Sequence, residues 1–126
     1  MAVKPPLVVV VDDEASICRA LLRLLRTANL RAEAFCAARD FLEFLRHQTP
    51  DCVILDLQMP HMSGMEVLER LQYFATPPPV IVITAFDQPG VRERCVELGI
   101  VGYLRKPVDS DKLLRSVHAA VAGGDA

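Results

Sequence analysis

Residues Leu7–Glu14 read LVVVVDDE, an unbroken apolar run that ends in three acidic side chains. Continuous runs of branched apolar residues are typical of strands that are covered on both faces of a parallel sheet. Two further runs of this kind are Cys52–Leu55 and Val80–Ile83. They end in polar residues, Asp56 and Thr84. The sequence therefore predicts buried parallel strands whose carboxyl ends carry polar side chains.

Two weaker strands and five helical stripes complete the pattern. Arg31–Phe35 alternates charged and apolar residues, which suits an edge strand, and Val101–Leu104 is a short fifth run. Apolar residues at helical spacing lie between the strands, within Ile17–Ala28, Phe41–Leu45, Met65–Gln72, Val91–Leu98 and Leu113–Val121. This alternation of strands and helices predicts an α/β fold with a doubly wound parallel sheet and right-handed crossovers.

Residues near the expected helix ends add local signals. Ser63 and Glu66 fit a capping box, and Asp109 can cap the last helix. Pro89 suits the first turn of the fourth helix, and Gly99 suits a left-handed cap after it.

The chain has 126 residues, 52% of them hydrophobic, and a formal net charge of −2. This size and composition predict one folded domain over residues 1–126, with a core from about residue 7 to residue 121. The small charge gives no electrostatic reason to expect direct nucleic-acid binding. The apolar runs are too short to span a membrane and no signal peptide is visible, so we expect a cytoplasmic protein.

The cysteines do not form the pattern of a metal site. Cys18, Cys36, Cys52 and Cys95 are scattered, without the clustered spacing that a zinc site needs. Disulfides are not expected in a reducing compartment, so we interpret all four as small buried hydrophobes. His61, in the loop after the second buried run, is expected to be exposed.

Acidic residues at the strand ends predict a metal site. Open α/β sheets bind ligands at the carboxyl ends of their strands, so Asp12, Asp13 and Asp56 should form one cluster. Mg²⁺ prefers oxygen ligands and keeps several waters. We expect Asp13 and Asp56 to bind Mg²⁺ directly, with Mn²⁺ as an alternative ion. Asp12 would bind through water, and the backbone carbonyl of Gln58 would supply a further ligand.

The same edge of the sheet predicts phosphoryl chemistry. Aspartate is an established nucleophile toward phosphorus, and Asp56 lies at the centre of the expected cluster. Lys106 and the Thr84 hydroxyl would hold the phosphoryl oxygens. Each residue alone has an ordinary role as a helix cap, a turn former or a solvated charge. Their joint occurrence on successive strand ends favours a phosphoryl site.

Together these segments resemble the receiver domain of two-component response regulators. The matching motifs are VVDDE, LDLQMPHMSGMEVL, ITA and GYLRKP, and the resemblance extends from Leu7 to about Val121. It implies a flavodoxin-like five-stranded sheet with strand order 2-1-3-4-5. It also implies that Asp56 receives a phosphoryl group from a sensor histidine kinase or a phosphotransfer protein. Asp12 and Asp13 would then form the Mg²⁺ pocket.

The resemblance further implies a conformational switch. Thr84 and Lys106 would bind the phosphoryl group, and Tyr103 falls at the aromatic switch position of the family. The Lys106–Pro107 peptide bond would be cis. Phosphorylation would change the surface of the fourth helix, the fifth strand and the fifth helix, where a partner or a second copy of the chain would bind.

The segments MPHMSGMEVL and FLEFL look closest to the FixJ-like transcriptional regulators. Those proteins carry a DNA-binding domain after the receiver, which leaves two alternatives for this chain. It is either a stand-alone receiver or the amino-terminal part of a DNA-binding regulator. In both cases we expect no direct contact between the receiver itself and nucleic acid.

Two positions are not determined by the family pattern. Gln58 lies two residues after Asp56, and Phe86 lies two residues after Thr84. Both border the expected path of a hydrolytic water. We predict that Phe86 limits access of water to the phosphoryl group and that Gln58 tunes the orientation of that water.

Two other functions fit parts of the pattern. A metal-dependent phosphatase that forms an aspartyl phosphate usually needs a second acid two residues after its nucleophile, and that position is Gln58. A nucleotide-binding flavodoxin-like domain would need a Gly-rich phosphate loop after the first strand, which the sequence lacks. We therefore expect a phosphoacceptor switch and not an enzyme, with phosphoryl turnover limited to its own Asp56.

Overall fold

The computed structural model describes residues 4–123, so the predicted domain bounds of 1–126 extend past it and the predicted core lies within it. Five parallel strands form one sheet in the order β2-β1-β3-β4-β5, which confirms the predicted flavodoxin-like fold. The strands are β1 (Leu7–Val11), β2 (Arg31–Phe35), β3 (Cys52–Asp56), β4 (Val80–Thr84) and β5 (Gly102–Arg105). β5 begins one residue later than predicted.

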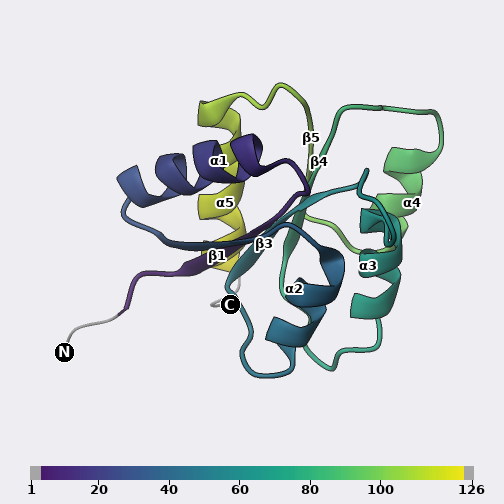
Figure 1. Cartoon of the computed structure of the whole chain (residues 1–126), viewed down its shortest axis with the longest axis horizontal. Coiled ribbons are helices and arrows are strands. Elements are labelled where there is room, and N and C mark those ends of the chain that lie inside the picture. The colour runs from purple at the N-terminus through teal and green to yellow at the C-terminus, as the bar shows by residue number, and fades with distance from the viewer. Residues whose placement is uncertain (1–3, 124–126) are drawn as a thin grey trace.

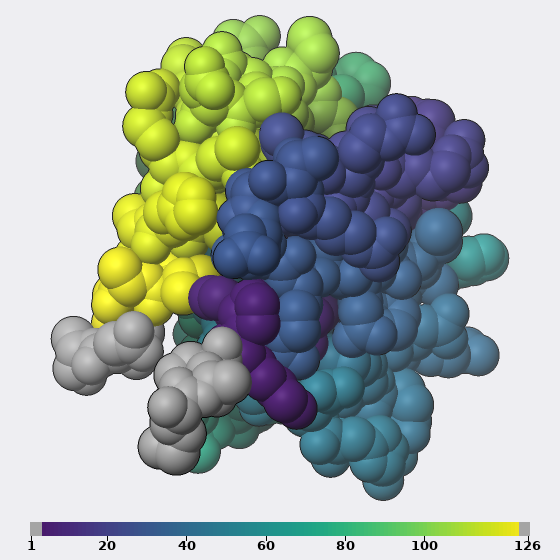
Figure 2. Space-filling view, turned by 90° about the vertical axis from the view of Figure 1, so that its left-hand side faces the viewer, coloured from purple at the N-terminus to yellow at the C-terminus, as the bar shows by residue number. Residues whose placement is uncertain are grey.

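Five helices connect and cover the strands. They are α1 (Ala15–Thr27), α2 (Ala38–Leu45), α3 (Gly64–Leu71), α4 (Val91–Glu97) and α5 (Ser110–Gly123). α1 and α5 cover one face of the sheet, and α2, α3 and α4 cover the other (Figure 1). Figure 2 shows α5, in yellow, beside the purple and blue segment of α1. Within residues 4–123 no helix is long and apolar enough to cross a membrane.

The strand sequences match this two-sided cover. In β1, Val9 packs into the core under α2, α3 and α4, and Val8 packs into the core under α1 and α5. All five residues of β1 are buried, because both faces of a central parallel strand are covered. β2 lies at the edge of the sheet as predicted, with Arg31 and Glu33 exposed and Ala32 buried between them.

Side-chain caps begin two of the helices. The Ser63 hydroxyl accepts a hydrogen bond of 3.3 Å from the Glu66 N–H at the start of α3. The Asp109 Oδ1 accepts a hydrogen bond of 3.0 Å from the Lys112 N–H in the first turn of α5. Each cap satisfies a backbone donor that the helix itself leaves free.

The two signals around α4 have different outcomes. Gly99 has φ +88°, the left-handed conformation that was predicted for a cap after this helix. The prediction for Pro89 is wrong, because α4 begins at Val91. Gly90, with φ 85°, turns the chain into the helix and leaves Pro89 in the preceding loop.

The cysteines are free thiols in the structure. Cys18, Cys52 and Cys95 are buried, as predicted. Cys36 is exposed, so the prediction for this residue is wrong. It lies just beyond β2, the edge strand, where the chain has left the covered part of the sheet.

The parallel register brings four strand ends together at one edge of the sheet. Asp56 is the last residue of β3 and Thr84 is the last residue of β4, while Asp12 and Lys106 directly follow β1 and β5. The Lys106 N–H donates a hydrogen bond of 2.8 Å to the Thr84 carbonyl, which fixes the end of β5 beside the end of β4.

Candidate functional site

Three polar side chains are buried at this edge of the sheet. Asp12 and Thr84 are 0% exposed and Asp56 is 1% exposed, and within residues 4–123 no other polar or charged side chain is buried. Burial of a carboxylate is costly unless the charge is paired or hydrogen-bonded. The placement of two aspartates here therefore indicates a site and not a simple turn.

Asp12, Asp13 and Asp56 each place a carboxylate oxygen within 4.8 Å of the others. Asp12 Oδ1 accepts a hydrogen bond of 2.9 Å from the Glu14 N–H. Asp12 Oδ2 is buried and makes no hydrogen bond of good geometry, although the Lys106 ammonium lies 2.9 Å away. Three carboxylates this close together, with one ammonium beside them, form an all-oxygen cluster that fits a hard divalent cation such as Mg²⁺.

Lys106 supplies the positive charge of the cluster. Its Nζ lies 2.9 Å from Asp12 Oδ2, 3.4 Å from Glu14 Oε1 and 3.5 Å from Asp56 Oδ2. Burial lowers the pKa of Lys106, but the contact with Asp12 and the nearby carboxylates outweigh burial, so its pKa is raised above the ordinary value. Lys106 therefore remains a cation among the acids. The Lys106–Pro107 peptide bond is cis.

The electrostatics of Asp56 differ from those of an exposed aspartate. Burial and the neighbouring Asp12 charge raise the pKa of Asp56 from 3.8 to about 6, against the opposing effect of Lys106. The Gln58 N–H also donates a hydrogen bond of 3.2 Å to Asp56 Oδ1. The Asp56 carboxylate is thus ionised near neutral pH but remains more basic than an exposed one.

Thr84 is hydrogen-bonded through its side chain to two neighbouring loops. Its hydroxyl lies 2.8 Å from Gln58 Oε1 in the loop after β3. In the loop after β4, the same oxygen accepts a bond of 3.1 Å from the Phe86 N–H and lies 3.0 Å from the Phe86 carbonyl. The Phe86 residue itself is 61% exposed.

Tyr103 is in β5, and its hydroxyl is directed to the loop after β4. The hydroxyl donates a hydrogen bond of 2.9 Å to Asp87 Oδ1. The Arg92 guanidinium lies 5.5 Å from the centre of the Tyr103 ring. Burial and the Asp87 contact raise the pKa of Tyr103 to about 12, so this hydroxyl is protonated at neutral pH.

Three site residues were missed by the sequence reasoning. Glu14 contacts Lys106, and the Cys18 thiol donates a hydrogen bond of 3.1 Å to the Asp12 carbonyl. Asp87 is the third, because its carboxylate accepts a hydrogen bond from the Tyr103 hydroxyl. Glu14 belongs to the quoted acidic motif and could have been included, whereas Cys18 and Asp87 carry no local sign of these contacts.

The comparison with known families decides the identity of this arrangement. The family of the response regulator receiver domain matches residues 8–118. This chain belongs to the response regulator receiver domain family. The receiver domain is the signalling domain of two-component response regulators, as the sequence motifs predicted.

Known relatives support the assignment. The receiver domain is 35% identical to the transcriptional regulatory protein TdiR of Thauera aromatica over 115 residues, which are 91% of this chain and 51% of TdiR. It is 30% identical over 112 residues to the transcriptional regulatory protein FixJ of Bradyrhizobium diazoefficiens, with 89% and 55% of the two chains covered. This chain therefore spans about half the length of these curated relatives.

A solved structure gives the same answer in three dimensions. The crystal structure of a response regulator receiver protein from Burkholderia phymatum superposes with a TM-score of 0.81 at 45% sequence identity. The match covers 93% of this chain and 95% of that one. Fold and family thus agree along nearly the whole receiver domain.

The loop after β3 packs against the start of α3 at Gly64. A Cβ at this position would overlap the carbonyl oxygen of Asp56 and lie 2.7 Å from the Leu57 Cα. Glycine is therefore required for the close approach of α3 to the backbone of Asp56. His61, in the same loop, is exposed as predicted and has φ 70°.

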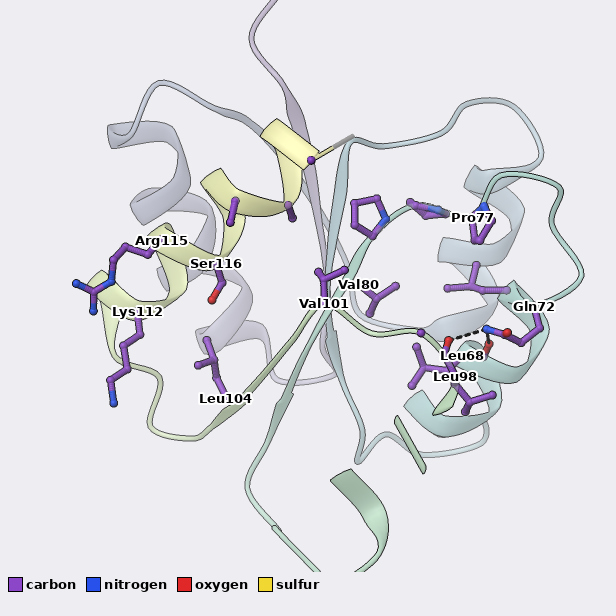
Figure 3. Close-up of a pocket in the computed structure, with 17 residues that line it drawn as sticks. Leu68, Gln72, Pro77, Val80, Leu98, Val101, Leu104, Lys112, Arg115 and Ser116 are labelled. Atoms are coloured by element: carbon purple, nitrogen blue, oxygen red, sulfur yellow. Dashed lines mark hydrogen bonds between the residues drawn. The ribbon is translucent and has the colours of Figure 1, made fainter. Parts of the chain in front are cut away.

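A groove of about 870 Å³ in the receiver domain lies away from the acidic cluster. It is at the opposite end of the sheet, near Val80 and Val101 at the amino-terminal ends of β4 and β5 (Figure 3). Its lining is mainly apolar, with Lys112 and Arg115 of α5 on one side and Gln72 on the other. This groove therefore shares no residue with the acidic cluster.

Proposed function

We propose that Asp56 is the phosphoacceptor of this receiver domain and takes a phosphoryl group from a sensor histidine kinase or a phosphotransfer protein. One observation carries the proposal: a buried carboxylate at a strand end has two other carboxylates within 4.8 Å and the Lys106 ammonium 3.5 Å away. This cluster combines a nucleophile with the charges that phosphoryl transfer requires.

The transfer exchanges one bond to phosphorus for another. A carboxylate oxygen of Asp56 attacks the phosphorus of a phosphohistidine, and the bond from phosphorus to the imidazole nitrogen breaks. The leaving imidazole keeps the electron pair and takes up a proton. Asp56 becomes an acyl phosphate, and water later attacks its phosphorus to release inorganic phosphate and restore the carboxylate.

Asp13 and Asp56 would hold Mg²⁺ or Mn²⁺ directly, with Asp12 acting through water and the Gln58 carbonyl as a further ligand. When bound, the ion supplies positive charge to the phosphoryl oxygens. Lys106, which lies beside Asp12 and Asp56, provides a second positive charge. Its raised pKa keeps it ionised during the reaction.

Phosphorylation would act as a switch through Thr84 and Tyr103. The phosphoryl group adds about two negative charges at pH 7. Thr84 would turn its hydroxyl toward a phosphoryl oxygen and leave space into which the Tyr103 ring turns. This is a population shift between two packings of the same fold, because it changes side-chain contacts and not strand order.

The surface of α4, β5 and α5 would receive the signal, and we propose a second copy of the chain as its partner. Val101 is exposed beside β5. α4 carries both signs of charge, with Arg92, Glu93, Arg94 and Glu97, and α5 carries Lys112 and Arg115 together with Asp111. A two-fold dimer needs a patch that complements itself, and a surface with both signs of charge on each helix meets that requirement.

Oligomeric state tests the dimer separately from the chemistry. Sedimentation should show more dimer after phosphorylation, and Arg115→Glu should remove that increase. A phosphorylated chain that remains monomeric at every concentration would exclude this partner.

Because TdiR and FixJ are named as transcriptional regulators, we further propose that the receiver domain controls a transcriptional output in its full-length protein.

The chemistry is tested by labelling with acetyl phosphate. Labelling should require Mg²⁺ or Mn²⁺ and should vanish in Asp56→Asn, while Asp40→Asn on the exposed part of α2 should label normally. A stable label on another residue would contradict the assignment. Continuous hydrolysis of an external phosphate ester would instead favour the metal-dependent phosphatase.

A further inference from the structure

The Thr84 hydroxyl is fully engaged in this structure. It accepts a hydrogen bond from the Phe86 N–H at 3.1 Å. Its single proton has two acceptors, Gln58 Oε1 at 2.8 Å and the Phe86 carbonyl at 3.0 Å. A hydroxyl has only one proton to donate, so Thr84 cannot bond a phosphoryl oxygen without giving up these acceptors.

Gln58 is the acceptor that comes from outside the loop of Thr84. It lies 26 positions away in sequence and belongs to the loop after β3, whereas Phe86 belongs to the loop that follows Thr84 itself. The Gln58 backbone N–H also bonds Asp56 Oδ1 at 3.2 Å. One residue therefore contacts both the proposed phosphoacceptor and the proposed switch hydroxyl.

We propose that Gln58 is a positioning residue that holds Thr84 in the unphosphorylated arrangement. The bond from Thr84 to Gln58 Oε1 must break before the hydroxyl can turn to a phosphoryl group. Its free energy opposes the switched state and favours the resting state. This inference rests on the proposed function, and it gives Gln58 a role that is separate from orienting a hydrolytic water.

The size of the effect follows from the strength of one hydrogen bond. A typical bond of this kind changes an equilibrium by about two- to tenfold. Removal of the Gln58 acceptor should therefore tighten the binding of any ligand that requires the switched Thr84 by about two- to tenfold. Gln58 is exposed, so its substitution leaves the core intact.

Beryllium trifluoride separates this role from an effect on water. It is a tetrahedral phosphoryl mimic that binds a carboxylate and is not hydrolysed as an acyl phosphate is. Calorimetric titration at saturating Mg²⁺ should show about two- to tenfold tighter binding to Gln58→Met than to the unmodified chain. Methionine keeps the side-chain length and removes the acceptor. Gln48→Met, at an exposed glutamine beyond α2, is the matched control and should bind like the unmodified chain.

A double-mutant cycle with Thr84→Val tests whether Gln58 acts through the Thr84 hydroxyl. Valine keeps the shape of threonine without the hydroxyl, so Gln58→Met should change beryllium trifluoride affinity little in that background. A metal-free denaturant cycle over the same four proteins should show a coupling of about two- to tenfold in the unfolding equilibrium. This second measurement requires neither Mg²⁺ nor beryllium trifluoride.

The outcomes distinguish the proposed role of Gln58 in holding Thr84, here called the latch, from the phosphoacceptor function on which it rests. Failure of the unmodified chain to bind beryllium trifluoride would overturn the proposed phosphoacceptor, and the latch with it. Normal binding by the unmodified chain with equal affinity in Gln58→Met would overturn the latch alone. Tightening by Gln58→Met that persists in the Thr84→Val background would also overturn it, because the effect would not pass through Thr84.

Discussion

The Tyr103 hydroxyl donates a hydrogen bond of 2.9 Å to Asp87 Oδ1, and this bond holds the ring toward the loop after β4. The Arg105 Nε lies 4.0 Å from Asp87 Oδ2 and the Arg92 guanidinium lies over the Tyr103 ring. These contacts oppose the inward turn of Tyr103 that the proposed switch requires. The loop between β4 and α4 therefore contacts both switch side chains, through Phe86 at Thr84 and through Asp87 at Tyr103.

Asp87→Asn should lower the pKa of Tyr103 from about 12, because the mutation removes the charge that favours the protonated phenol. The fall should be partial, since burial is the larger cause of the raised pKa. Absorbance of tyrosinate in a Tyr73→Phe background reports Tyr103 alone, because the chain has two tyrosines. Circular dichroism in parallel confirms that the chain remains folded. An unchanged pKa in the folded variant would show that the hydrogen bond to Asp87 contributes little to the raised pKa of Tyr103.

Asp56→Asn should stabilise the metal-free protein above pH 6. The folded pKa of Asp56 is raised from 3.8 to about 6, so the folded state prefers the protonated form. The contribution of Asp56 to stability is therefore full below pH 3.8 and is lost as pH rises to about 6. Asparagine avoids this loss and should add about 1–3 kcal/mol to the free energy of unfolding at pH 8.

Urea denaturation at several pH values measures this difference. The gap between Asp56→Asn and the unmodified chain should open between pH 4 and pH 6 and stay constant above it. Lys106 does not disturb this window, because its raised pKa places its own titration at high pH. A gap that is equally large at pH 4 would mean that packing, and not ionisation, causes the stabilisation.

Lys106→Met should destabilise the metal-free protein by about 2–4 kcal/mol at pH 8, because it leaves Asp12 and Asp56 buried without their cation. Mg²⁺ should recover part of the loss by replacing the missing charge. Thermal unfolding with and without Mg²⁺ tests both statements. Lys112→Met, at an exposed lysine of α5, serves as the control and should change little. Equal stability of the Lys106 and Lys112 variants would argue against a strained acidic cluster.

Gly64→Ala should destabilise the fold by about 1–3 kcal/mol, because the new methyl group overlaps the backbone of Asp56 and Leu57. Gly123→Ala is the matched control, since a Cβ there meets nothing within 4 Å. That substitution should be neutral or slightly stabilising in helix α5. Denaturant midpoints compare the two variants. A Gly64→Ala protein as stable as the control would show that α3 can move away from the loop at no cost.

Phe86→Ala should shorten the lifetime of the Asp56 phosphoryl group several-fold if the ring limits the access of water. Its backbone is held by two hydrogen-bond contacts to Thr84, so truncation of the exposed ring should leave the loop in place. Decay of the acetyl phosphate label measures the lifetime. Tyr73→Ala removes another exposed aromatic ring, which follows α3 and is not part of this loop, and should leave the lifetime unchanged. The same lifetime in Phe86→Ala would exclude this role.

Periodic patterns predicted most of the fold because they depend on local chemistry. Unbroken apolar runs predicted β1, β3 and β4, and alternating residues predicted the edge strand β2. The order 2-1-3-4-5 came from the resemblance, since alternation alone allows other orders. The convergence of Asp12, Asp56, Thr84 and Lys106 was predictable because parallel strands end at a common edge.

The local errors have the same physical origin. Pro89 is compatible with a helical first turn, but the turn at Gly90 decides where α4 begins. Cys36 resembles the other cysteines in sequence, but its position beyond an edge strand leaves it exposed. In each case the residue type allowed several environments, and the surrounding chain selected one.

By itself, the sequence determined which residues stand at the strand ends, what chemistry they offer and to which family the chain belongs. Only the tertiary structure decided which side chains they touch. Gln58 bonds Thr84 across 26 positions and Lys106 meets Glu14 across 92 positions. No local pattern encodes such pairs, because side-chain directions at loop positions are set by packing between distant segments. Both contacts join segments that are far apart in the sequence.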